Sequence, residues 1–250
     1  MTQIVIICHT VRGYIKPNVS LSIDTEEVHY NYPRWDTNNK PFVDLGLPSG
    51  TLWATMNVGA DKPSDYGLYF QWGDTQGYTK EQVGNGEGQK QFAQNWSDYK
   101  WHLSGDSYDN VAFTKYTTQG ATLELEDDAA HVHMGGDWHM PTPKQIQELL
   151  DNTTTARTTS DGISGMTFTS KKDTSKSIFI PTPGTATNSY ISYYGNYCYV
   201  WSSMLIINNL DSNFINTAKC LRIYKNTFYS GINIGDEIRN TGCSIRGVLG

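Results

Sequence analysis

The sequence predicts an α+β domain behind a small β-rich N-terminal segment. Two stretches have the 3.6-residue periodicity of amphipathic helices, and the rest alternates short strand-like runs with loops rich in Gly, Trp and Tyr. Helices and strands do not alternate as they do in βαβ units, which argues against a parallel sheet. With 12% aromatic residues, a chain of 250 residues can bury a sizeable core.

The charge balance excludes several classes of protein. The formal net charge is -6, so the chain lacks the basic surface of a protein that binds nucleic acid. No apolar run approaches the roughly 18 residues that a membrane-spanning helix needs. The first ten residues contain a short apolar run without a basic leader, so we expect no signal peptide in this chain.

Residues 1–41 are expected to form a β-rich segment that ends in a linker. Its strand-like runs are 3–11, 18–23 and 27–32. The last ten residues of the segment are rich in Pro and Asn, a composition typical of a linker. We therefore expect a second domain that covers 42–250.

Two helices are expected in this second domain. The first covers 125–133, where Ala129, Ala130 and Val132 lie on the apolar side. The second covers 144–150, after a capping Thr142 and a proline at the first helical position. Its apolar face holds Ile146, Leu149 and Leu150.

The remaining chain is expected to consist of long loops and short strands. The stretch 73–120 has the composition of long loops. After the second helix the apolar patterns predict strands at 165–169, 177–180, 197–202, 218–224, 231–234 and 244–249.

Several sequence blocks in this domain resemble a known family. The blocks are FVDLGLPSGTLWATMNVGA at 42–60, YGLYFQWGDT at 66–75, DDAA at 127–130, GGDWHMPT at 135–142, WSS at 201–203 and SIRGV at 244–248. In this order they resemble the Fibrobacter succinogenes major paralogous domain family, which is abundant in gut bacteria and their phages. The resemblance covers about 42–250 and leaves 1–41 uncovered.

The resemblance implies a C-type-lectin-like fold with two helices, several short antiparallel strands and long loops. It also implies that four tryptophans are core or loop-anchoring residues: Trp53, Trp72, Trp138 and Trp201. Some members of this lectin-like group are variable proteins of diversity-generating retroelements. In these proteins an adenine-directed copying process randomises chosen codons, which then cannot encode Lys, Trp, Met, Gln or Glu.

The resemblance places such a variable region at about 188–243, and its free positions avoid the forbidden residue types. We expect the ligand-binding surface to consist of Tyr190, Ser192, Tyr193, Tyr194, Asn196, Tyr197, Tyr199, Ile206, Asn208, Asn209, Cys220, Arg222, Tyr224, Asn226, Phe228, Tyr229, Asn233, Asp236, Asn240, Thr241 and Cys243.

The strand pattern supports this assignment. Leu221 and Ile223 share one face of their strand, so Cys220, Arg222 and Tyr224 lie on the other. A solvated strand face normally carries Lys, Glu and Thr, and exposed aromatic groups gathered in one region mark a binding surface. The alternative is that these aromatic residues form a second core layer under the 73–120 loops.

Metal and enzyme chemistry find little support in the sequence. No CxxC pair occurs among the four cysteines, which are Cys8, Cys198, Cys220 and Cys243. The acidic run 124–128 lies at a helix start, where carboxylates favour the helix dipole, and a calcium role stays open. The motifs of serine hydrolases, P-loop proteins and dinucleotide-binding proteins are absent. We expect no catalytic residue, no bound metal and no cofactor.

The sequence therefore predicts a receptor-binding protein rather than an enzyme. Its C-terminal surface would be diversified by a retroelement and would contact a cell-surface protein or a glycan. Two alternatives remain: an undiversified surface adhesin or glycan-binding protein, and a divergent enzyme of the formylglycine-generating type. The expected location is a phage tail or a bacterial cell surface, and homo-oligomers remain open.

Overall fold

The computed structural model describes residues 42–93, 95–207, 215–225 and 230–250. In this part of the chain, thirteen strands form five small antiparallel sheets, two α-helices are present, and 13% of the residues are helical. The fold is therefore mostly β, and the prediction of an α+β, C-type-lectin-like fold is wrong. The expected β-rich segment 1–41 lies outside the described residues.

Two long strands account for much of this difference. β5 (Thr153–Ser160) has five Thr among eight residues, and their branched Cβ atoms favour extended backbone without producing an alternating apolar pattern. β12 (Ser230–Ile238) extends beyond its predicted run because it pairs along its whole length with β11 (Thr217–Lys225). The helices α1 (Ala129–Met134) and α2 (Pro143–Asn152) have only six and ten residues.

The positions of both helices agree with the sequence pattern. Thr142 caps α2 by accepting a hydrogen bond from the Gln145 N–H, and the Gln145 side chain accepts one from the Thr142 N–H. Before α1, residues Leu125–Asp127 form a 3-10 turn (η3), and the Asp128 carboxylate accepts a hydrogen bond from the His131 N–H at 3.0 Å. The first predicted helix is thus a 3-10 turn followed by a short α-helix. Ala129 and Ala130 are buried as expected, but Val132 is 40% exposed.

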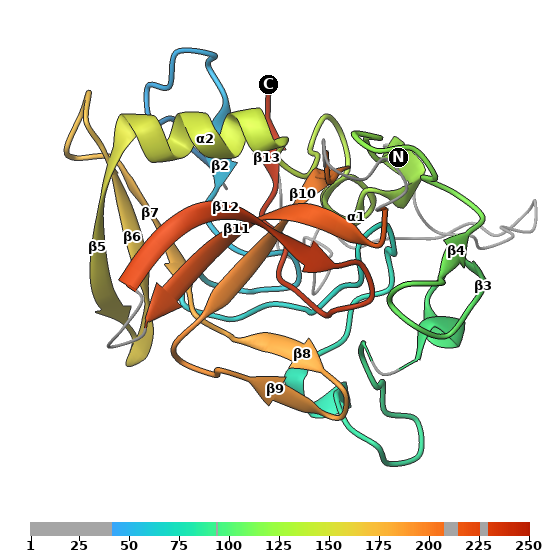
Figure 1. Ribbon diagram of the computed structural model, residues 1–250. Helices are drawn as coiled ribbons and strands as arrows, with labels where there is room; N and C mark the ends of the chain where they lie inside the picture. Colours follow the sequence, from blue (N-terminus) through green and yellow to red (C-terminus); the bar gives the residue numbers. More distant parts are fainter. Residues whose placement is uncertain (1–41, 94, 208–214, 226–229) are drawn as a thin grey trace, which may run out of the picture. The chain divides into compact units, whose positions relative to one another are not determined.

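The sheet at the centre of Figure 1 contains β10 (Cys198–Leu205), β11 and β12 in that order. One face of this sheet packs against α2. Leu149 of the helix belongs to the same apolar cluster as Val200, Leu221 and Ile223, and all four side chains are fully buried. Burial of each such side chain contributes about 1.5–3 kcal/mol to folding.

A second core lies against the other face of this sheet. Trp201 and Cys220 are paired across β10 and β11 and share an apolar cluster with Phe70 and Trp72. The Trp72 indole N–H donates to the Ser202 carbonyl, and the Trp201 indole N–H donates to the Phe70 carbonyl, both at 2.8 Å. The prediction of four core tryptophans is confirmed, since all four are buried: Trp53, Trp72, Trp138 and Trp201.

β5 pairs with β6 (Ile163–Ser170), which pairs in turn with β7 (Ser177–Pro181). Figure 1 shows β5 as the outermost strand of this sheet, on the left. The turn between β5 and β6 consists of Asp161 and Gly162, with φ of 49° and 79°. Two positive φ values are typical of the type I′ turn that closes a two-residue hairpin.

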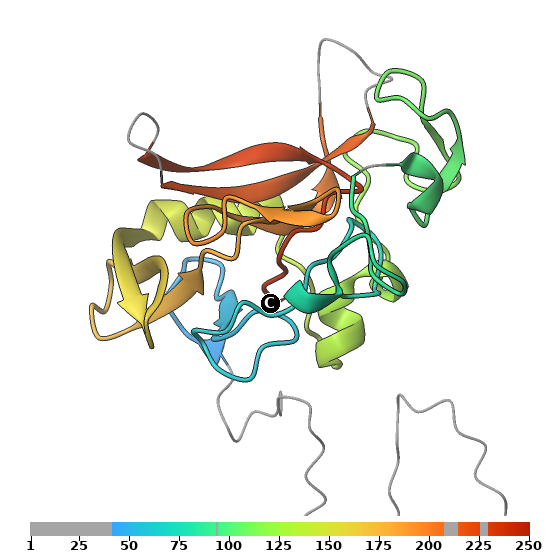
Figure 2. The same ribbon diagram turned by 90° about the horizontal axis from the view of Figure 1, so that it is seen from below.

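The short hairpin of β8 (Thr185–Thr187) and β9 (Tyr190–Ser192) lies on the side of the central sheet opposite to α2, as Figures 1 and 2 show. Residues 193–196 form the turn that leads from β9 into β10. The turn therefore lies between the β8–β9 hairpin and the end of the central sheet where β10 begins.

The remaining elements are short. The start and the end of the described domain meet in one sheet of β1 (Phe42–Val43), β2 (Leu52–Ala54) and β13 (Val248–Leu249). The expected loop stretch contains two 3-10 turns and a small hairpin: η1 (Lys80–Gln82), η2 (Trp96–Asp98), β3 (His102–Ser104) and β4 (Ala112–Phe113). The described residues from 42 onward belong to one compact unit. None of their helices is long and apolar enough to cross a bilayer.

Candidate functional site

Seven tyrosines gather around the β9–β10 turn and the adjacent end of the central sheet. We call this group the tyrosine surface: Tyr66, Tyr190, Tyr193, Tyr194, Tyr197, Tyr199 and Tyr224. Ring contacts join Tyr66 to Tyr194 on one side and link the rings from Tyr193 to Tyr199 on the other. All members except Tyr66 belong to the predicted ligand-binding set.

Three of these tyrosines project into solvent. The exposed fractions of Tyr190, Tyr193 and Tyr194 are 56%, 61% and 42%. Only eight large apolar or aromatic side chains are at least 40% exposed in the described ranges, and three of them lie within the five consecutive residues 190–194. Exposed aromatic groups gathered in this way are typical of interaction surfaces. The alternative of a buried aromatic layer is therefore wrong for these three residues.

The turn that carries them is held in one conformation. Tyr193 has φ of 57°, in the left-handed region that a bulky residue rarely adopts. The N–H groups of Asn196 and Tyr197 both donate to the Tyr193 carbonyl, at 2.9 and 3.1 Å, and Gly195 donates to the Thr182 carbonyl at 2.9 Å. Strained residues held by surrounding structure cluster at functional sites. The exposed rings are therefore positioned before any ligand arrives.

Ring packing fixes the side chains as well. The Tyr193 ring stacks on the Tyr197 ring with centroids 4.4 Å apart and planes 18° apart. Tyr224 meets the rings of Tyr197 and Tyr199 edge-on at 5.3 and 5.9 Å. Each aromatic pair of this kind is worth about 0.5–1.5 kcal/mol beyond the area that it buries. The half-buried tyrosines thus support the exposed ones.

A cation lies on each side of the tyrosine surface. The Lys80 ammonium is 4.0 Å from the centre of the Tyr194 ring, and the Arg222 guanidinium is 5.1 Å from the centre of the Tyr199 ring. Both distances are within the range of a cation–π interaction. The Tyr66 ring meets the Tyr194 ring edge-on. Burial is the main cause that raises the pKa of the Tyr66 hydroxyl, and its hydrogen bond with Tyr194 raises this pKa further.

Arg222 retains unused hydrogen-bonding capacity. Its Nη2 atom is 3.6 Å from Glu237 Oε2, which is too long for a hydrogen bond, and its Nε atom has no partner among the described residues. Gly235 on β12 makes room for this side chain, because a Cβ atom there would lie 2.5 Å from Arg222 Cδ. The unpartnered Nε atom is itself buried, so only the partly exposed end of the guanidinium is within reach of a ligand.

Five residues of the predicted surface are buried, and their assignment to that surface is wrong: Ile206, Cys220, Asn240, Thr241 and Cys243. Alternation along β11 does place Cys220 opposite Leu221, but a core covers both faces of the sheet at this level. Cys243 exchanges two backbone hydrogen bonds with Phe70, at 2.9 and 3.0 Å, which draws the segment 240–243 inside. Sequence alternation cannot reveal a second covering layer.

The other predicted residues divide into two groups. Asn196 and Asn233 are exposed, while Ser192 and Asp236 are partly buried, and Lys219 pairs with Asp236 at 2.6 Å. Five further positions lie outside the described residues: Asn208, Asn209, Asn226, Phe228 and Tyr229. Sequence reasoning missed Tyr66 and Lys80, because their contacts with Tyr194 join distant parts of the chain.

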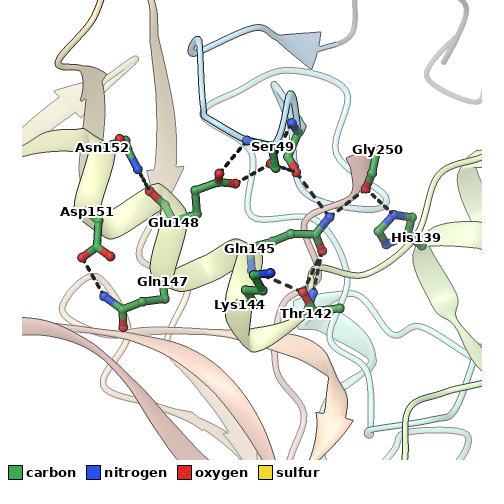
Figure 3. A pocket seen from close by; sticks show the side chains of 11 residues that line it. Ser49, His139, Thr142, Lys144, Gln145, Gln147, Glu148, Asp151, Asn152 and Gly250 are labelled. Carbon is green, nitrogen blue, oxygen red and sulfur yellow. Dashed lines mark hydrogen bonds between the residues drawn. The ribbon is translucent and has the colours of Figure 1, made fainter.

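The structure also contains a pocket of about 600 Å³ along α2 (Figure 3). Its polar groups bond to one another: Ser49 donates through its N–H and its Oγ to Glu148 at 2.7 and 2.5 Å, and Gln145 donates to the Gly250 carbonyl at 2.8 Å. His139 also lies within 3.3 Å of that carbonyl. With these groups already paired, the pocket offers few of the convergent polar groups that a ligand site needs.

An acidic cluster forms next to α1. Glu124, Glu126 and Asp127 bring carboxylate oxygens within 4.8 Å of one another. The Lys115 ammonium lies among them, at 2.6, 3.2 and 2.6 Å, and Lys100 reaches Asp127 at 2.8 Å. Two lysines therefore already offset most of the negative charge of these three carboxylates.

The three described cysteines are free and fully buried. Burial raises the pKa of the Cys198 thiol to about 12, and it also raises the pKa values of Cys220 and Cys243. Because the thiolate is the form that attacks substrates and binds metals, these thiols suit core packing. The cysteines therefore give no support to the alternative of an enzyme of the formylglycine-generating type.

No family model, no curated protein and no solved structure matches this chain. The resemblance to the Fibrobacter succinogenes major paralogous domain family therefore stays a prediction from its motifs.

Proposed function

We propose that this chain is a ligand-binding protein that contacts a macromolecular partner through the tyrosine surface. The observation that carries the proposal is the group of Tyr190, Tyr193 and Tyr194, exposed together on a turn whose backbone is fixed. Tyrosine offers a large contact area and loses little conformational entropy on binding. A fixed turn reduces that loss further.

The chemistry of the surface favours a protein or a glycan as the partner. Tyr and Arg are enriched among the residues that dominate binding energy, and Asn196 and Asn233 add amide hydrogen bonds at the rim. The net charge of -6 speaks against nucleic acid. The fitting location is a bacterial cell surface or a phage tail, where receptor recognition takes place.

We also propose that the exposed part of this surface is diversified by a retroelement. The support is the motif resemblance together with the permitted residue types at the free positions. Burial reduces the number of positions that can be diversified. Cys220, Asn240, Thr241 and Cys243 belong to the core, where a random residue would disturb packing. Variation is expected at Tyr190 and at the turn that follows it.

Sequencing the genomic neighbourhood tests diversification. We expect a reverse transcriptase gene and a near-identical template repeat that differs from this gene at adenines in the codons of the exposed residues. If the neighbourhood has neither, the protein is an undiversified adhesin or glycan-binding protein.

Binding is tested with fluorescently labelled protein on a glycan array and on a panel of intact bacterial cells. The variant for comparison is Tyr190→Ser, Tyr193→Asn, Tyr194→Ser, which keeps a residue that tolerates positive φ at 193. We expect the wild type to bind at least one probe and the variant to lose that binding. Equal binding by both proteins would place the binding site elsewhere.

A further inference from the structure

The β5 edge has little of the protection that proteins usually give an edge strand. It is the outer strand of the sheet β5-β6-β7 (Figure 1), and six consecutive residues, 154–159, are exposed. The strand contains no Pro, no Gly and a single charge, Arg157. Proteins normally protect such an edge with Lys, Pro or a bulge, because its unpaired backbone groups can pair with another strand.

The hydrogen bonds of the neighbouring strand β6 show which residues of β5 have backbone N–H and C=O groups that face the open edge. Ser170 N–H donates to Lys176 at 2.9 Å, and Thr182 N–H donates to Ser164 at 3.0 Å, so even-numbered residues of β6 bond toward β7. Odd-numbered residues of β6 then bond toward β5, where the register pairs Ile163 with Ser160. The even-numbered residues of β5 therefore face β6, and the N–H and C=O groups of its odd-numbered residues face outward.

This alternation limits how two copies of β5 can pair. In an antiparallel pair, outward-facing groups must meet outward-facing groups, so a two-fold axis passes through a residue position and not between two residues. Two registers keep seven residues paired, one centred on Ala156 and one on Arg157. The register on Arg157 sets two like charges opposite each other, which is unfavourable.

We propose that β5 pairs with β5 of a second copy in the register centred on Ala156. Ala156 then faces its own copy at a non-hydrogen-bonded position, where Cα atoms approach to about 4.5 Å and a small side chain fits. Thr154 faces Thr158, and Thr155 faces Arg157. Arg157 donates to the Tyr224 carbonyl of its own chain, and an uncharged Thr opposite leaves that contact intact.

This dimer does not depend on the ligand-binding proposal, because it buries the β5 edge, which adjoins the tyrosine surface only through the contact of Arg157 with the Tyr224 carbonyl. Closed two-fold pairing would also remove the edge that makes the isolated chain prone to open-ended association. Two linked chains would present two tyrosine surfaces to a cell, and such pairing strengthens attachment without any new contact.

Sedimentation equilibrium over a concentration series tests the pairing. The wild type should reach twice the monomer mass, and Thr155→Pro should weaken dimerisation at least about tenfold, because it removes an outward N–H that pairing with a second copy requires. Thr158→Val is the matched control: it changes an exposed side chain of the same strand but no backbone donor, and it should dimerise like the wild type. A wild-type protein that stays monomeric up to about 1 mM would overturn the proposal, and so would undiminished dimerisation of Thr155→Pro.

Disulfide trapping tests the register without relying on the folding of a proline variant. Under mild oxidation, Ala156→Cys should form a covalent dimer, because the two Cβ atoms face each other across the axis. Thr158→Cys should not, because its two copies lie four residues apart along the strand, about 14 Å. The wild type reports the background from native thiols. Equal trapping of both variants, or trapping of neither, would refute the register.

Discussion

The guanidinium carbon of Arg239 lies 4.0 Å from the centre of the Phe113 ring. Arg239 is fully buried at the end of β12, and Phe113 belongs to β4 in the distant loop stretch. The Arg239 Nε donates to the Tyr99 hydroxyl at 2.9 Å, and its Nη1 donates to the Tyr116 carbonyl at 3.2 Å. One arginine thus ties the long 73–120 stretch to the end of the central sheet.

Replacing Arg239 should destabilise the whole domain. Arg239→Met keeps much of the side-chain volume but leaves buried carbonyl groups without donors, at about 1–3 kcal/mol for each group. Arg239→Lys should fail as well, since an ammonium cannot reproduce the planar fork. Urea unfolding should show a loss of at least about 3 kcal/mol for Arg239→Met. A loss below 1 kcal/mol would mean that the loops are held by other contacts.

Core and surface aromatic residues should differ sharply in their effect on folding. Trp138 is buried, with 4% exposure, whereas Tyr190 is 56% exposed. Trp138→Ala should cost about 3–5 kcal/mol, the usual range for a buried aromatic residue. Tyr190→Ala should change the free energy of unfolding by less than about 0.5 kcal/mol. The reverse order in thermal unfolding would contradict the assignment of faces.

The backbone at Tyr193 makes a specific prediction. With φ of 57°, the position favours Gly or Asn over a β-branched residue. Tyr193→Asn relieves the backbone but loses the stacking on Tyr197, so it should stay within about 1 kcal/mol of the wild type. Tyr193→Val should be less stable than the Asn variant by about 1–2 kcal/mol. Denaturant titration of the three proteins makes the comparison. Equal stability of Asn and Val variants would show that the turn adopts another conformation.

Acid should weaken the ion-pair network next to α1. Burial would raise the pKa of Asp127, but three donors outweigh it and hold this pKa below its usual value: Lys100, Lys115 and Tyr116. Because the folded pKa is the lower one, the stabilisation is complete above the unfolded pKa of about 4 and is lost as pH falls through the folded pKa.

Asp127→Asn tests this sign. The variant should be less stable than the wild type at pH 7 and should lose less stability between pH 7 and pH 3, measured by urea unfolding at both values. Glu126→Gln, at an exposed position that also contacts Lys115, is the matched control and should change the pH dependence less. A steeper acid loss in Asp127→Asn would reverse the sign of the linkage.

Local signals in the sequence predicted several elements correctly. The Thr142 and Pro143 pair marks the start of α2, and alternation identified Leu221 and Ile223 as the buried face of β11. The prediction of the fold class was wrong in part because β5 has no apolar alternation and is a strand through its pairing with β6. The local signal that the sequence reading missed is the Asp161-Gly162 pair, which is typical of the two-residue turn that joins these strands.

The candidate site was predictable to a similar extent. An unusual density of tyrosine identified Tyr190, Tyr193 and Tyr194, which are exposed. The same reasoning placed Cys220 and Cys243 on the surface, and both are buried beneath a second layer. Alternation reports which side of a strand a residue faces, but it does not report what covers that side.

The most direct measurement is the dissociation constant for the ligand recovered from the array or the cell panel. Three proteins are compared. They are the wild type, the triple variant Tyr190→Ser, Tyr193→Asn, Tyr194→Ser, and a control triple variant at similarly exposed apolar residues elsewhere: Leu103→Ser, Leu125→Ser, Ile207→Ser. We predict a loss of at least about 100-fold for the tyrosine variant and a change below about threefold for the control. Full affinity in the tyrosine variant would contradict the assignment of this surface to ligand binding.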